Sequence, residues 1–207
     1  KLKPYKTGAT SAYVISALSQ AQLDGVPILN LSDLFPASIS TLTSLRIAIS
    51  DYSGLLICAA GNQGNDIGVT ASYPSSFDLS NIISVGACDN AGNPTGYTNT
   101  GDVEVDIFAP GHVATTGLSN QYIWSDGTSV AAPLVTGVAA LLKSYKPSLT
   151  TAQLKAAILD GAATKSALNG LCVTGGMLDA YGALLEVTGN LKNYDVEIGV
   201  NAIDKIT

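Results

Sequence analysis

The sequence has little charge and a single histidine. Of its 207 residues, 13% are Asp, Glu, Lys or Arg and 46% are hydrophobic, and the net charge is -6. Ten basic side chains spread along an acidic chain argue against a surface that follows nucleic-acid phosphates. The apolar content is too high for a disordered chain and fits a buried core. We therefore expect one folded domain without a nucleic-acid partner.

Paired cysteines and membrane-length apolar runs are also missing. The three cysteines form no C-x-x-C pair, which argues against a zinc site and against a disulfide framework. Even the apolar stretch at 130–142 contains Pro133 and Gly137, and it is shorter than the about 18 residues of a membrane span. The chain begins at Lys1 without a signal-like segment, which is typical of a mature product or a fragment. The localisation stays unknown on these grounds.

Helical and strand-like segments alternate along the chain. Apolar residues recur at helical spacing in 11–21, 39–49 and 128–142, and Thr150 and Gln153 form a capping box before another helix. Short apolar runs at 26–31, 55–60, 82–87 and 103–108 are typical of buried strands. This alternation predicts an α/β fold, a three-layer sandwich in which helices cover both faces of a mostly parallel sheet.

One motif presents a candidate nucleophile. Ser129 lies in the sequence GTSVAAP at 127–133, where a glycine precedes a helix of small residues. Free backbone N–H groups and the positive end of a helix dipole favour an anion that develops at such a position. A serine hydroxyl needs a base to take its proton, however, and the chain contains only His112. An ordinary helix-capping serine is the alternative interpretation of Ser129.

Four motifs in order resemble the subtilisin-like serine proteases, or subtilases. They are AAGN at 59–62, YP at 73–74, APG at 109–111 and GTSVAAP at 127–133, and residues 175–180 are similar to the closing helix of that fold. The resemblance implies a serine endopeptidase that acts on polypeptides. It also implies a subtilisin-like fold that lacks its N-terminal strands in this chain. We expect a peptidase domain at 1–188, followed at 189–207 by a tail or an extra edge strand.

The resemblance assigns roles to individual residues. It implies that Ser129 forms the acyl-enzyme and that Asn62 donates from the oxyanion hole. Asn62 precedes Ser129 by 67 residues, close to the separation of about 66 in subtilisin. A turn residue after a strand is the alternative for Asn62. The substrate-binding residues implied in the same way are Ser32, Asp33, Leu34, Ala59, Ala60 and Gly61.

The primary specificity pocket departs from the family pattern. Where subtilases have a Ser-Leu-Gly-Gly stretch, this chain has Ser32-Asp33-Leu34-Phe35. The missing glycines normally let the substrate backbone approach closely. The change predicts a reshaped or blocked pocket and leaves the preferred substrate side chain open.

The aspartate and histidine of a subtilase triad are missing from the chain. In subtilisin the histidine precedes the serine by about 157 residues and the aspartate lies about 30 residues earlier, so both positions would fall before Lys1. His112 is expected in a loop that the family does not use for catalysis. We expect an N-terminal fragment or upstream sequence of the same protein to supply both residues. The alternative is a catalytically inactive pseudoprotease or truncated fragment that acts as a binding module.

The family offers weaker expectations about partners and ions. Many subtilases fold with the help of a propeptide and most are secreted, so the resemblance alone favours an extracellular location. Glu104 and Asp106 alternate on a predicted strand, where some subtilases hold a weak structural cation, and a solvated edge is the alternative. Otherwise we expect no metal and no cofactor. The sequence GNQG at 61–64 lacks the spacing of a dinucleotide-binding loop, and Ser129 lacks the G-x-S-x-G of an esterase.

Overall fold

The computed structural model describes residues 1–7, 10–35 and 39–189. The α-helices are α1 (Ser11–Leu23), α2 (Ile39–Asp51), α3 (Thr128–Tyr145), α4 (Thr151–Asp160) and α5 (Ala180–Thr188). The strands are β1 (Ile28–Leu31), β2 (Leu55–Ala59), β3 (Ile82–Cys88), β4 (Ile107–Pro110), β5 (His112–Thr116), β6 (Tyr122–Asp126), β7 (Ala163–Thr164) and β8 (Gly176–Met177). Short 3-10 turns span Leu118–Asn120 and Ser166–Leu168.

The main sheet is parallel over most of its width. Its strand order is β1-β2-β3-β4-β8-β7, and only the β7–β8 pair is antiparallel within it. Leu31 at the end of β1 lies opposite Cys58 in β2, and Ala59 lies opposite Val85 in β3. Parallel strands place their carboxyl ends at one edge, and this is where ligands bind in open α/β sheets. The predicted, mostly parallel sheet is confirmed.

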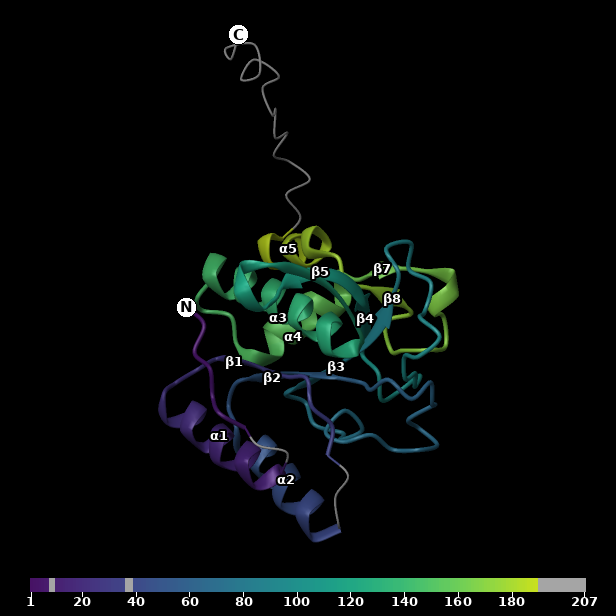
Figure 1. Cartoon of the computed structure of the whole chain (residues 1–207). Helices are drawn as coiled ribbons and strands as arrows, with labels where there is room; N and C mark the ends of the chain where they lie inside the picture. Colours follow the sequence, from purple (N-terminus) through teal and green to yellow (C-terminus); the bar gives the residue numbers. More distant parts are fainter. Residues whose placement is uncertain (8–9, 36–38, 190–207) are drawn as a thin grey trace.

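Side chains of β2 alternate between two cores. Leu55, Ile57 and Ala59 belong to the core that α3, α4 and α5 cover, whereas Leu56 and Cys58 belong to the core under α1 and α2. Figure 1 shows the sheet between these two helical layers. The predicted three-layer sandwich with helices on both faces is therefore confirmed. No helix in the described part of the chain is both long and apolar enough to cross a membrane.

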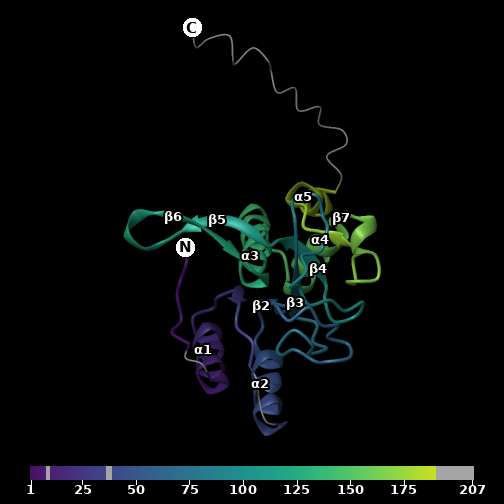
Figure 2. The ribbon, with the colours of Figure 1, turned by 45° about the vertical axis from the view of Figure 1, so that its right-hand side comes forward.

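The structure corrects two local predictions. Residues 102–104 form a turn, residues 105–106 have no regular secondary structure, and β4 begins only at Ile107, so the strand expected over 103–108 is displaced. His112 opens strand β5, not a loop, and pairs across an antiparallel hairpin with Asp126 of β6. This hairpin, which the sequence did not predict, projects from the body of the molecule (Figure 2). The expected tail or edge strand lies outside the described residues, apart from Gly189 at the end of α5.

One edge of the main sheet is open in the part of the chain that the structure describes. β1 pairs only with β2 there, and its outer edge borders a groove of about 530 Å³. The groove is lined by residues 1–5, by the inner face of α1, by β1 itself, and by Ser32 and Asp33. An open strand edge presents unpaired backbone donors and acceptors to its surroundings.

Asp106 forms an ion pair with Lys155. Lys155 of α4 lies 3.0 Å from its carboxylate, which also accepts a hydrogen bond of 2.7 Å from Ser84 N. The side chain of Asp106 is only 14% exposed, which contradicts a solvated edge. Burial raises the pKa of Asp106, and the charge of Lys155 opposes that rise. Since Glu104 and Asp106 precede β4, they do not share a strand face, and no described group of three or more His, Cys, Asp or Glu could hold a metal.

Replacing Lys155 with methionine is expected to lower the free energy of unfolding by about 3 kcal/mol, because the Asp106 carboxylate then stays buried without its partner. The raised pKa lets folded Asp106 keep its proton where the unfolded chain has lost it, so its contribution to stability falls as the pH rises through that range. Loss of Lys155 should raise the pKa of Asp106 further and so extend to higher pH the range over which stability falls. Urea unfolding at several pH values measures both effects.

The double variant Asp106→Asn/Lys155→Met provides the control. It removes the charge that Lys155 neutralises, so it should be more stable than Lys155→Met alone. Equal stability of the two variants would contradict the interpretation of this contact as a stabilising ion pair.

Candidate active site

The candidate site lies where two strands end and the central helix begins. Ser32 directly follows β1, Ala60 and Asn62 follow β2, and α3 starts at Thr128. Because β1 and β2 are parallel neighbours, their carboxyl ends lie side by side at this edge. Residues that are far apart in the sequence therefore meet around Ser129.

Ser129 and Ser32 contact each other through two hydrogen bonds. Ser32 Oγ donates to the carbonyl oxygen of Ser129 at 2.9 Å, and Ser129 Oγ donates to the carbonyl oxygen of Ser32 at 3.3 Å. Asn30 Nδ2 in turn donates to Ser32 Oγ at 3.0 Å. The end of β1 thus positions the first turn of α3, and Ser129 remains half-buried, not sealed in the core.

Thr128 fixes the orientation of the Asn62 amide. Its backbone N–H and its hydroxyl both donate to Asn62 Oδ1, each at 2.9 Å, while its hydroxyl oxygen accepts from Gly61 N at 3.1 Å. The two bonds to Oδ1 use both lone pairs of the amide oxygen, and Nδ2 has no hydrogen-bond partner among the residues that the structure describes. The Asn62 side chain is exposed, so Nδ2 is available as a donor. At Gly127, with φ +133°, an added Cβ would lie 3.1 Å from Asn62 Nδ2, so glycine permits this close approach.

The expected substrate-binding residues surround the same junction. Ala59 and Ala60 are buried, with the Ala59 side chain in the core under α3, so at these positions the backbone is what the site can use. The Leu34 side chain packs against Gly61, because a Cβ added at Gly61 would lie 2.8 Å from Leu34 Cδ1. Asp33 is exposed beside it. Leu34 thus occupies the space beside the backbone of Gly61.

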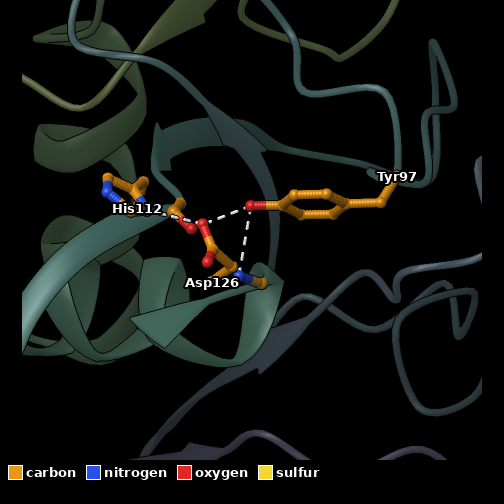
Figure 3. A network of polar contacts seen from close by, with 5 residues as sticks. Tyr97, His112 and Asp126 are labelled. Carbon is orange, nitrogen blue, oxygen red and sulfur yellow. Dashed lines mark hydrogen bonds and ion pairs between the residues drawn. The ribbon is translucent and has the colours of Figure 1, made fainter. Parts of the chain in front are cut away.

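His112 has a carboxylate partner but does not contact the serine. Its Nδ1 lies 2.6 Å from Asp126 Oδ1 (Figure 3). Its ring stacks on Trp124 with 4.7 Å between ring centroids. A carboxylate at Nδ1 is the arrangement that orients a histidine base. The hydroxyl of Ser129, however, donates to Ser32, and among the described residues no hydrogen bond joins it to an imidazole. His112 is therefore not in place as its base.

Two residues beside the site, Tyr97 and Asn99, could not be predicted from the sequence. Asn99 is buried against the loop that carries Asn62, and Tyr97 reaches the residue before Thr128. Both lie in a loop-rich segment without periodicity or a recognisable motif. Nothing in their spacing could have marked them.

Comparisons with known proteins agree with this arrangement. The Subtilase family (Peptidase S8) matches residues 1–183. Subtilisin DY of Bacillus licheniformis is 34% identical over 149 residues, which cover 70% of this chain and 53% of that protein. The thermostable alkaline protease of Halalkalibacterium halodurans is 37% identical over 146 residues, which cover 70% of this chain and 38% of that protein. The matched part thus spans about half the length of subtilisin DY.

Solved structures show the same fold. The prenylagaramide maturation protease PagA superposes with a TM-score of 0.73 at 26% identity, covering 91% of this chain and 72% of that one. A lanthipeptide protease gives a TM-score of 0.74 at 23% identity over 84% of this chain and 66% of its own, which is a likeness of fold alone. On its motifs, its sheet and these relatives, the chain belongs to the subtilase family of serine proteases.

Proposed function

We propose that this chain supplies the nucleophile and the oxyanion hole of a subtilisin-type serine endopeptidase. Ser129 is the nucleophile and Asn62 is the oxyanion donor. The observation that carries the proposal is the fixed amide of Asn62, whose oxygen accepts both donors of Thr128. Its NH₂ group is thereby held ready for charge that develops on a substrate carbonyl.

In the proposed reaction, Ser129 Oγ attacks the carbonyl carbon of a peptide bond while an imidazole takes the hydroxyl proton. The carbonyl electron pair moves onto oxygen, where Asn62 Nδ2 and backbone N–H groups at the start of α3 stabilise it. The C–N bond then breaks, the leaving amine takes the proton, and an acyl-enzyme remains on Ser129. Water hydrolyses this ester by the reverse proton transfers and frees the serine.

The imidazole and its aspartate come, in this proposal, from sequence upstream of Lys1 or from an N-terminal fragment of the same protein. The open edge of β1 supports this, because its groove is lined in part by Ser32, which contacts Ser129. A segment in that groove would bring a base next to the nucleophile. Without a base, a subtilisin loses about 10⁶-fold in rate.

The substrate backbone is proposed to run between the ends of β1 and β2. The polypeptide would contact the backbone of residues 59–61 on one side and of Ser32 and Asp33 on the other. Leu34, which lies against Gly61, would limit the size of the side chain accepted there. Cleavage of a degenerate quenched-fluorescent peptide library would show which side chains fit.

Asn62→Ala in the protein that includes its upstream sequence is expected to lower kcat by about 10²–10³-fold with little change in KM, because the amide acts on the transition state. Steady-state kinetics on a peptide selected from the library measures it.

Ser129→Ala should abolish turnover. It should also abolish stoichiometric labelling by phenylmethylsulfonyl fluoride, which intact-mass spectrometry would detect in the wild-type protein. A full-length protein that neither cleaves the library nor takes up the label would instead support the binding-module alternative.

Thr128→Val tests the orientation of Asn62 separately. The variant keeps the side-chain shape but leaves buried Gly61 N without its acceptor, at an expected cost of about 1–3 kcal/mol in unfolding free energy. It should also lower kcat, though less than Asn62→Ala does, because only one of the two hydrogen bonds that orient the Asn62 amide then remains. Thr128→Ser, which keeps the hydroxyl, is the matched control. A Val variant with the kcat of the Ser variant would contradict the role given to this hydroxyl.

A native mass spectrum of protein purified from its source tests the upstream partner. We expect the 21.1 kDa chain to appear inside a heavier species, either joined to its upstream sequence or bound to a second polypeptide. Peptide sequencing of the additional mass should find an aspartate segment and a histidine segment. An active species of the chain mass alone would overturn the proposal that the base comes from elsewhere.

A further inference from the structure

A buried amide, Asn99, organises the loop that carries Asn62. Asn99 is 1% exposed, and its Nδ2 donates to Ala60 O at 2.8 Å and to Gln63 Oε1 at 3.0 Å. Its Oδ1 accepts from Gln63 N at 3.1 Å and from Asn65 N at 3.0 Å. Two donors and two acceptors are the full hydrogen-bonding capacity of an asparagine side chain. Every one of these bonds goes to the loop at 60–65.

The bonds of Asn99 lie on both sides of Asn62 in the sequence. Before it, Asn99 holds Ala60 and, through its own backbone N–H, the carbonyl of Gly61 at 2.9 Å. After it, the side-chain oxygen accepts from the backbone N–H groups of Gln63 and Asn65. A Cβ added at Gly61, where φ is +110°, would lie 2.4 Å from Asn99 Nδ2, so the loop is moulded closely around this amide. Asn99 therefore sets the path of the backbone from which Asn62 projects.

The same short segment also holds the turn that carries the nucleophile. The Tyr97 hydroxyl donates to Gly111 O at 2.8 Å and accepts from Gly127 N at 3.1 Å, at the base of the β5–β6 hairpin (Figure 3). The carbonyl of Tyr97 accepts from Gly64 N at 2.8 Å, in the loop of Asn62. Gly127 directly precedes Thr128, which bonds to Asn62. Residues 97–99 thus touch both sides of the candidate oxyanion hole.

We propose that Asn99, supported by Tyr97, is a positioning residue that sets the distance between the Asn62 amide and Ser129. It touches neither substrate nor nucleophile and acts only through the loop of Asn62. The inference rests on the proposed function, because a loop position matters for rate only if Asn62 stabilises the transition state. Displacement of a catalytic group by about 1 Å can cost 10²-fold in rate, so a loop loosened at four hydrogen bonds should lose rate without losing substrate binding.

The test is a double-mutant cycle in the full-length protein that includes its upstream sequence. Asn99→Ser is expected to lower kcat by about 10- to 100-fold with less than about a twofold change in KM. In the Asn62→Ala background the same substitution should change kcat by less than about twofold, because the group that it positions is gone. Equal losses of kcat in the two backgrounds would show a merely structural role and overturn the inference.

Asn81→Ser is the matched control. Asn81 is a half-buried amide that donates to Ile49 O at 2.7 Å and to Tyr52 O at 2.8 Å, away from the candidate site. Its loss should lower the melting temperature and leave kcat unchanged. If Asn81→Ser lowers kcat as much as Asn99→Ser does, general loosening of the fold explains both and the inference fails.

A second pair of variants keeps the inference testable if Asn99→Ser does not fold. Tyr97→Phe removes only the hydroxyl that bridges Gly111 and Gly127, and it should lower kcat several-fold at constant KM. Tyr52→Phe, which removes a hydroxyl bonded to Val26 O at 2.6 Å beside α2, should not. Failure of the proposed function is distinguishable, since Asn62→Ala would then keep the wild-type kcat. A hundredfold loss in Asn62→Ala with none in Asn99→Ser and Tyr97→Phe would refute only the positioning role.

Discussion

The hydroxyl of Thr128 joins the end of β2 to the beginning of α3, and the rest of the candidate site depends on that junction. It accepts from the backbone of Gly61 and donates to the amide of Asn62, while it is completely buried. The helix behind it is anchored by small and branched side chains that face the sheet, among them Ala131, Ala132 and Val135. Small residues let a helix approach a sheet closely, so core packing also fixes the position of Ser129 relative to the sheet.

The fold was largely predictable because helix and strand periods are local properties of the sequence. Segments that alternate in this way must form a parallel sheet with helices on both faces, and the structure has this arrangement. The hairpin of β5 and β6 escaped prediction because its exposed face mixes His112, Trp124 and Asp126 with polar residues, so it shows no alternation of apolar and polar positions. Asp106 was misplaced for a different reason, since its burial depends on Lys155 of α4, a contact between distant segments.

The candidate site was only partly predictable for a related reason. Ser129 and Asn62 could be named because motif and spacing carry information about residues whose side chains act directly. Asn99 could not, because three of the four hydrogen bonds of its side chain go to main-chain atoms, and the backbone partners of a residue leave no trace in the sequence. The sequence therefore indicated which groups would react, and the structure was needed to find what holds them.

Under the proposed function, both the stability and the activity of this protein depend on the outer edge of β1. The outer edge of β1 has no strand partner in the described residues, and the same strand leads into Ser32, which bonds to Ser129. An upstream segment that paired with this edge would satisfy its backbone groups and deliver the missing base in one docking event. Nucleophile and oxyanion donor, in contrast, are already fixed by contacts within the described chain. Docking would thus complete the triad beside an oxyanion hole that is already in place. Activity would then depend on association of the upstream segment, whereas the local geometry of Asn62 would not.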